Sequence, residues 1–99
     1  MAPEVSEFEE LQGRLRGLLI AVANLLPRVT VQLAGEMIDA NECGLALETI
    51  SEMLVESRAA IDAEALTSVS QLVEAMGLPA VNVDRLRPLV TSTRDDGAS

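Results

Sequence analysis

Apolar residues recur every three or four positions along most of the chain, which is the spacing of one face of an α-helix. The first such segment runs from about Ser6 to Leu26, and Ser6 with Glu9 predicts a capping box at its start. Pro27 then ends this helix or opens the next one. The predicted inner face of the segment comprises Phe8, Leu11, Leu15, Leu18, Leu19, Val22, Leu25 and Leu26.

Three further segments carry the same spacing. A second helix is predicted from about Arg28 to Ala40, a third from about Glu42 to Arg58 with Asn41 as its N-cap, and a fourth that starts near Asp62. The fourth ends at Gly77, the expected left-handed C-cap, ahead of Pro79. The predicted inner faces are Val29, Leu33, Met37 and Ile38; then Cys43, Ala46, Leu47, Ile50, Met53 and Leu54; and finally Leu66, Val69, Leu72, Val73 and Met76.

Four amphipathic helices with short connections predict an all-α fold, an antiparallel four-helix bundle with a short C-terminal extension. We expect residues 1–90 to form a single helical domain and residues 91–99 to be a flexible polar tail. The segment 81–90 is either a short extra helix or an extended strap, and Pro88 limits both.

The composition adds detail to this core. Phe8 is the sole aromatic residue, so aliphatic side chains must fill the interior. Cys43 is the only cysteine and is expected to be a buried small hydrophobe. Residues 14–26 resemble the basic and apolar parts of a secretory signal, but four glutamates precede them and the run is too short to span a bilayer. The sequence therefore predicts a cytoplasmic protein.

The absence of several residue types restricts the catalytic and metal sites that this chain can form. The chain has no His, Lys, Tyr or Trp, which removes the commonest general base, a Schiff-base lysine and any zinc set. No catalytic residue, cofactor or metal site is therefore predicted, although a site built from carboxylates and Mg²⁺ stays open among sixteen acids. The net charge of −9 repels nucleic acid and anionic membranes and favours a basic protein partner. We expect a monomer or a weak homodimer.

The third predicted helix carries an acidic face opposite its apolar stripe. Glu48, Glu52 and Glu56 follow each other at intervals of four residues with no basic residue among them, although like charges at this spacing repel. Leu45 lies in the middle of this face, and the second helix adds further acids. The candidate partner-binding residues are Glu36, Asp39, Glu42, Leu45, Glu48, Glu52 and Glu56. Two plainer interpretations stay open: the acids only confer solubility, and Leu45 lies under the C-terminal strap.

The segment Asn41-Glu42-Cys43-Gly44-Leu45-Ala46-Leu47-Glu48-Thr49-Ile50 resembles the Gly-Glu…Ala-Leu-Glu…Leu/Ile signature of small bacterial immunity proteins of the MafI and colicin D immunity type. The ending Glu74-Ala75-Met76-Gly77-Leu78 is similar to the last helix of that family, so the resemblance covers about residues 28–78. Asn41 stands where a glycine is expected, which predicts a plain helix cap. The matching positions are Glu42, Ala46, Leu47, Glu48 and Ile50.

This resemblance implies a four-helix bundle that neutralises a cognate toxin, in the colicin D branch a ribonuclease whose basic active site the acidic immunity protein covers. It assigns toxin contact to Glu42 and Glu48, whereas the other candidate acids come from the helical wheel. The leading hypothesis is therefore an immunity protein that binds a toxin domain with a basic surface. A helical adaptor or self-associating module is the main alternative, and a carboxylate-metal enzyme is the third.

Overall fold

The computed structural model describes residues 7–91, and within this range the protein is helical with no strand. The all-α prediction is thereby confirmed, whereas the antiparallel four-helix arrangement stays a prediction. The predicted capping box involves Ser6, and the predicted tail covers 91–99; Ser6 and residues 92–99 lie outside the described residues. The elements are α1 (Glu7–Val22), η1 (Ala23–Leu25, a 3₁₀-helix), α2 (Arg28–Asp39), α3 (Cys43–Glu56), α4 (Ala63–Met76), α5 (Val81–Leu86) and η2 (Arg87–Leu89, a 3₁₀-helix).

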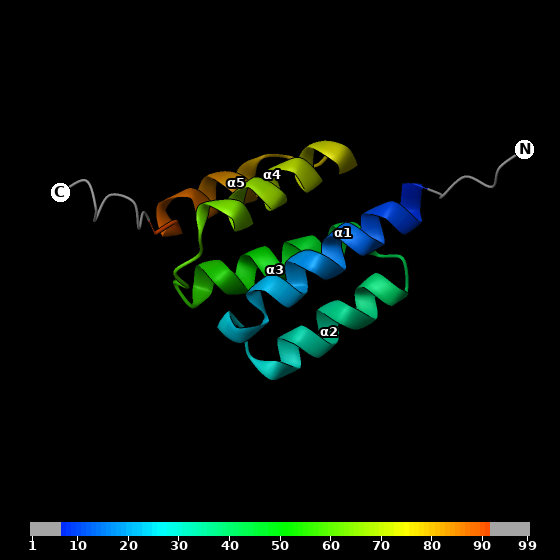
Figure 1. Ribbon diagram of the computed structural model, residues 1–99, viewed down its shortest axis with the longest axis horizontal. Coiled ribbons are helices and arrows are strands. Elements are labelled where there is room, and N and C mark those ends of the chain that lie inside the picture. The colour runs from blue at the N-terminus through cyan, green and yellow to red at the C-terminus, as the bar shows by residue number, and fades with distance from the viewer. Residues whose placement is uncertain (1–6, 92–99) are drawn as a thin grey trace, which may run out of the picture.

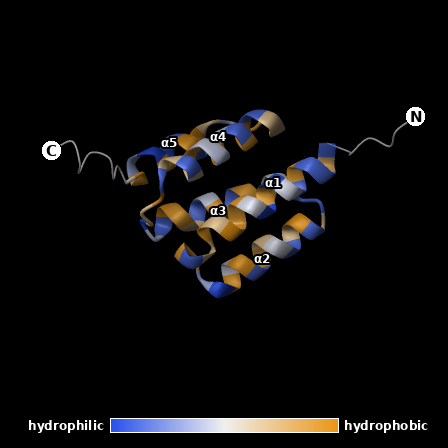
Figure 2. Cartoon of the chain, in the orientation of Figure 1, coloured by the Kyte–Doolittle hydropathy of each residue, from blue (hydrophilic) through white to orange (hydrophobic). Residues whose placement is uncertain are grey.

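The helices α1 and α3 lie between α2 on one side and the α4/α5 pair on the other (Figure 1). α1 contacts α2, α3 and α4, while α3 contacts α2 and α5 as well. Hydrophobic and hydrophilic segments alternate along each of these helices (Figure 2). The two central helices therefore supply most of the surfaces on which the other three helices pack.

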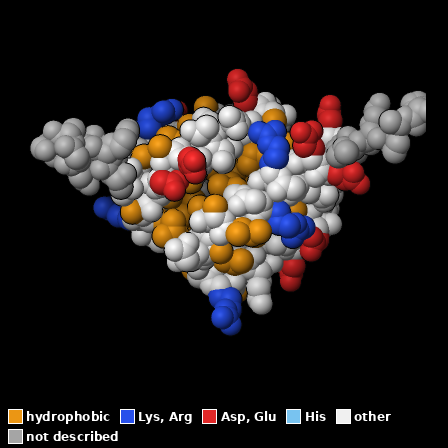
Figure 3. Space-filling model, in the orientation of Figure 1, with side chains coloured by type: hydrophobic (Ala, Val, Ile, Leu, Met, Phe, Trp, Pro, Cys, Tyr) orange, Lys and Arg blue, Asp and Glu red, His pale blue; other side chains and the backbone are white. Residues whose placement is uncertain are grey.

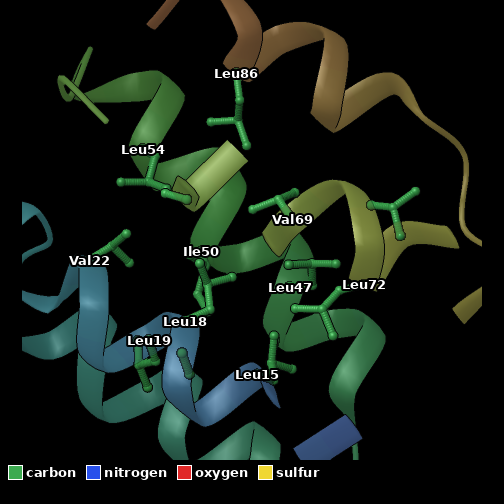
Figure 4. Close-up of a cluster of buried hydrophobic side chains, with 14 of the residues drawn as sticks. Leu15, Leu18, Leu19, Val22, Leu47, Ile50, Leu54, Val69, Leu72 and Leu86 are labelled. Atoms are coloured by element: carbon green, nitrogen blue, oxygen red, sulfur yellow. The ribbon is translucent and has the colours of Figure 1, made fainter. Parts of the chain in front are cut away.

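Aliphatic side chains form one continuous core, as the composition predicts. Buried residues from α1, α3, α4 and α5 point toward one another in its centre (Figure 4). The side chains with almost no exposed surface include Leu15, Leu47, Ile50, Leu54, Leu72 and Leu86. Burying a side chain of this size stabilises the fold by roughly 1.5–3 kcal/mol before the entropy of ordering is subtracted. The core therefore depends on the predicted stripes of α1, α3 and α4.

The predicted inner face of α2 is correct for Ile38, which is buried, and for Met37, which packs against the core, but wrong for its first half. Val29 and Leu33 are 69% and 45% exposed, and Thr30 and Ala34 are buried in their place. The small side chains of Thr30 and Ala34 let α2 approach α1 and α3 closely, and Gln12 Nε2 donates to the Ile38 carbonyl at 2.7 Å. Phe8 was also placed in the core by its spacing, but it is exposed in the first turn of α1. The described residues leave 61% of its surface uncovered.

Three helices end with the same backbone motif, in which one residue takes a positive φ and the next donates to the carbonyl five residues back. The positive-φ residues are Asn41, Arg58 and Gly77. Asn41 is thus the residue that ends α2, and the prediction that it caps α3 is wrong. Glu42 precedes α3 without a side-chain cap, whereas the predicted Asp62 cap of α4 is confirmed, with Oδ1 accepting from Ala65 N at 2.8 Å.

The ends of α3 and α4 share this motif but differ in the residue with positive φ, which is Arg58 in one and Gly77 in the other. The two ends therefore permit a matched test of the motif. A left-handed conformation costs an ordinary residue roughly 1–2 kcal/mol. Glycine avoids this cost, but its greater freedom in the unfolded chain cancels part of the gain in stability. We expect Arg58→Gly to raise the free energy of unfolding by about 0.5–1 kcal/mol and Gly77→Ala to lower it by about 1 kcal/mol. Urea unfolding followed by circular dichroism measures both. Equal effects of the two changes would contradict the assignment.

Residues 81–90, for which the sequence allowed either a short helix or an extended strap, form the helices α5 and η2 followed by a short backbone bridge. Val83 and Leu86 of α5 are buried, so α5 adds to the core instead of crossing it as an extended strap. After η2 the chain forms a parallel bridge between Ile61 and Val90. The Ile61 N–H donates to the Leu89 carbonyl at 3.2 Å, and the Thr91 N–H donates to the Ile61 carbonyl at 2.8 Å. These bonds attach the end of the described chain to the connection between α3 and α4.

The Ser51 hydroxyl is the one fully buried side-chain oxygen or nitrogen without a hydrogen-bond partner among the described residues. A buried hydroxyl without a partner costs about 1–3 kcal/mol. We expect Ser51→Ala to raise the free energy of unfolding by about 1 kcal/mol, measured in urea, because alanine also favours the helix. The exposed Thr67→Ala in α4 is the control and gains only the helix-propensity part, about 0.5 kcal/mol. An equal gain from both variants would contradict the proposed cost.

Candidate functional site

The acidic face predicted on α3 is present as an exposed surface. Glu48, Glu52 and Glu56 are all exposed and follow one another along successive turns of α3. The opposite side of the helix holds its buried residues, Cys43, Ala46, Leu47, Ile50, Ser51 and Leu54. Glu42 is exposed at the start of the helix. The helical wheel thus placed these four acids on the correct side of the domain.

Leu45 lies within this acidic face with 48% of its surface exposed. The alternative that the C-terminal segment covers Leu45 is wrong, since the segment turns into α5 and directs Val83 and Leu86 into the core. A large apolar side chain therefore stays in contact with solvent between Glu42 and Glu48, which lie about one turn to either side of it, and Glu52 follows two turns further along the helix.

The seven candidate residues differ in how their charge is balanced. Arg16 of α1 donates to Asp39 Oδ1, so the Asp39 carboxylate already has a cationic partner. Within residues 7–91 the other ion pair joins Arg87 and Asp84 at 3.7 Å, away from the candidate site. Glu36, Glu42, Glu48, Glu52 and Glu56 have no ion pair among the described residues. Asp39 is consequently the member of the set least able to bind a partner.

The helix α2 lies beside the acidic face of α3. Thr49 Oγ1 donates to Met37 Sδ at 3.5 Å, which fixes the two neighbouring edges of these helices. Val29, Leu33 and Glu36 are exposed on the outer side of α2. The sequence pattern assigned Val29 and Leu33 to the core, and not to this exposed surface, because apolar residues four positions apart are typical of a buried helix face. The same helix also carries Thr30, Ala34 and Ile38 at intervals of four, and this second spacing could have indicated the face that is buried.

A separate groove, of about 520 Å³, opens between α1 and α4. Buried side chains such as Leu18, Val22 and Leu72 form its floor, and the small residues Gly17 and Ala21 leave space along its α1 wall. Hydrophobic side chains are visible at the centre of this face, between α4 and α1, with charged side chains mainly toward the margins (Figure 3). None of the seven candidate residues lines this groove.

The remaining chemistry is sparse. Burial raises the pKa of the Cys43 thiol, which lowers its thiolate fraction at neutral pH and agrees with the expected buried, unreactive cysteine. In the described part of the chain, no group of three or more Cys, Asp or Glu side chains is placed to hold a metal ion. None of the helices in that part has the length and apolar content needed to cross a bilayer.

Comparison of the chain with protein-family models, with curated proteins and with solved structures gives no match. The resemblance to bacterial immunity proteins therefore stays a prediction from the residues of the segment 41–50 and the ending of α4.

Proposed function

We propose that this protein is an immunity protein that binds and neutralises a cognate bacterial toxin, a nuclease, in the cytoplasm. The observation that carries the proposal is the exposed row of Glu48, Glu52 and Glu56, which has no ion pair among residues 7–91 and has Leu45 exposed beside it. Glu36, Asp39 and Glu42 complete the binding surface. In the proposed architecture, α1 to α4 form an antiparallel four-helix bundle, to which α5 is the C-terminal extension.

The physical basis is substitution for phosphate groups. A nuclease holds its substrate with Arg and Lys side chains, and a carboxylate accepts the same charge-assisted hydrogen bonds as a phosphate oxygen. A row of glutamates on one rigid helix presents several such acceptors at intervals of about 6 Å, four residues of 1.5 Å rise. Leu45 supplies apolar contact area, and the negative field of the protein speeds encounter with the basic partner.

Co-expression tests this function directly. The C-terminal domain of the protein encoded immediately upstream of this gene is expressed in a bacterial host, with and without this chain. We expect growth arrest from the domain alone and growth restored by co-expression. The purified pair should form a one-to-one complex whose association slows as salt rises. A harmless neighbour, or a toxic one that this protein does not relieve, would argue against the proposal.

The groove between α1 and α4 favours a second candidate function, a non-enzymatic adaptor or a self-associating module. Apolar side chains such as Leu18, Val22 and Leu72 form the floor of the groove, and Ile20, elsewhere on α1, is 72% exposed, so α1 also offers apolar contact area. Light scattering of the purified protein over a range of concentrations tests self-association. A strict monomer that rescues growth supports the immunity function, whereas a dimer that does not rescue supports this second candidate.

A further inference from the structure

Two apolar residues on the outer side of α2 extend the acidic surface. Val29 and Leu33 are one turn apart and are 69% and 45% exposed. Leaving such side chains in water forgoes the stabilisation that burial would give, roughly 25 cal/mol for each Å² of apolar surface. The fold does not cover them, since Thr30, Ala34 and Ile38 occupy the buried side of the helix.

Carboxylates border these residues from both helices. On α2, Glu36 follows Leu33 by three residues and is exposed on the same outer side. On α3, Thr49 marks the edge nearest α2 because its hydroxyl contacts the Met37 sulfur at 3.5 Å. Helical spacing then places Leu45, Glu52 and Glu56 along that same margin of α3. The α2–α3 strip therefore combines three exposed apolar residues (Val29, Leu33, Leu45) with three exposed carboxylates (Glu36, Glu52, Glu56).

We propose that the α2–α3 strip takes a basic amphipathic helix of the partner protein. The proposal rests on the proposed function in that it identifies which element of the partner the acidic surface binds. The apolar face of that helix covers Val29, Leu33 and Leu45, and Arg or Lys residues at its borders pair with Glu36, Glu52 and Glu56. None of these glutamates has an ion pair within residues 7–91, so no existing pair has to be broken.

Charge and backbone together select this occupant. The glutamates repel nucleic acid and anionic lipid, which leaves a cationic protein surface as the complementary one. The described residues contain no strand whose edge an extended peptide would join, so recognition depends on side chains. Apolar residues at intervals of four on α2 form a helical ridge, and a second helix packs against such ridges with its own.

Titration with a designed peptide tests whether a basic amphipathic helix binds at the strip and not elsewhere on the protein. The probe is an 18-residue helical peptide of Leu, Ala and Arg with one apolar face, and the control is an isomer of the same composition and charge in scrambled order. Both are titrated into the ¹⁵N-labelled protein. We expect amide shifts concentrated on α2 and the adjoining margin of α3, and at least tenfold weaker binding of the scrambled isomer. Equal binding of the isomers, shifts elsewhere, or no binding would overturn the proposal.

Matched surface variants distinguish peptide binding at the strip from nonspecific binding to any exposed apolar residue. Val29→Ser with Leu33→Ser removes apolar area from the strip, whereas Ile20→Ser removes it from an exposed position on α1. We expect the double variant to bind the amphipathic peptide at least tenfold more weakly and Ile20→Ser to bind within twofold of the original protein. A double variant that binds normally would overturn the proposal.

Growth rescue by co-expression reports on the proposed function without the peptide. Normal rescue combined with a failed peptide titration removes only the helix-binding inference. Failed rescue combined with localised peptide binding removes the immunity function and leaves the strip as a docking surface for another basic helix.

Discussion

Leu47→Ala is expected to lower the free energy of unfolding by about 3 kcal/mol, within the 2–5 kcal/mol typical of a truncated core leucine. Leu47 is 1% exposed and packs at the centre of the core between α1, α3 and α4 (Figure 4). Its loss leaves a cavity that surrounding helices fill only in part, in addition to the lost transfer of apolar surface. For a domain of this size, a change of about 3 kcal/mol lowers the melting temperature by more than about 10 °C.

The control for this prediction lies two residues away on the same helix. Leu45→Ala makes the identical chemical change, but Leu45 is 48% exposed, so we expect a loss of less than about 0.5 kcal/mol. Urea unfolding followed by circular dichroism measures both variants, since the chain has no Trp or Tyr for fluorescence. A large loss for Leu45→Ala would mean that this residue belongs to the core and not to a binding surface.

Reversing two charges on α3 is expected to abolish most of the partner binding. In Glu48→Arg with Glu52→Arg, two attractions to the basic toxin become repulsions. At about 1.5 kcal/mol for each lost pair, the affinity falls by roughly a hundredfold. Surface plasmon resonance with the toxin domain identified by the growth rescue measures this loss, and the salt dependence of the association rate should weaken in parallel.

The fold should tolerate both reversals. Glu48 and Glu52 are exposed, and Arg at 52 faces Glu56 at a favourable spacing, so we expect the free energy of unfolding to stay within about 0.5 kcal/mol. The matched control is Glu64→Arg with Glu74→Arg, which changes the net charge equally on exposed positions of α4. If the control weakens binding as much as the α3 reversals do, net charge rather than the acidic face controls the affinity.

Predictions from sequence were accurate where one apolar stripe was unambiguous. On α3, the buried residues lie on one side and the acids on the other, as predicted, because acidic residues occupy most of the opposite face, Leu45 apart. Asp62 and Gly77 were correctly identified as the ends of α4, because a cap depends on local backbone geometry and on the side chain at that position. These features follow from neighbours within about five residues along the chain.

The sequence by itself determined that the chain is helical, where its first four helices lie and which side of α3 carries the acids. The tertiary structure decided which of two apolar spacings on α2 is buried, because close packing against α1 and α3 selects the small Thr30 and Ala34 over Val29 and Leu33. It also decided that Arg16 neutralises Asp39 and that α5 enters the core. Each of these depends on contacts between residues distant in sequence, whereas helical periodicity is a property of neighbouring residues alone.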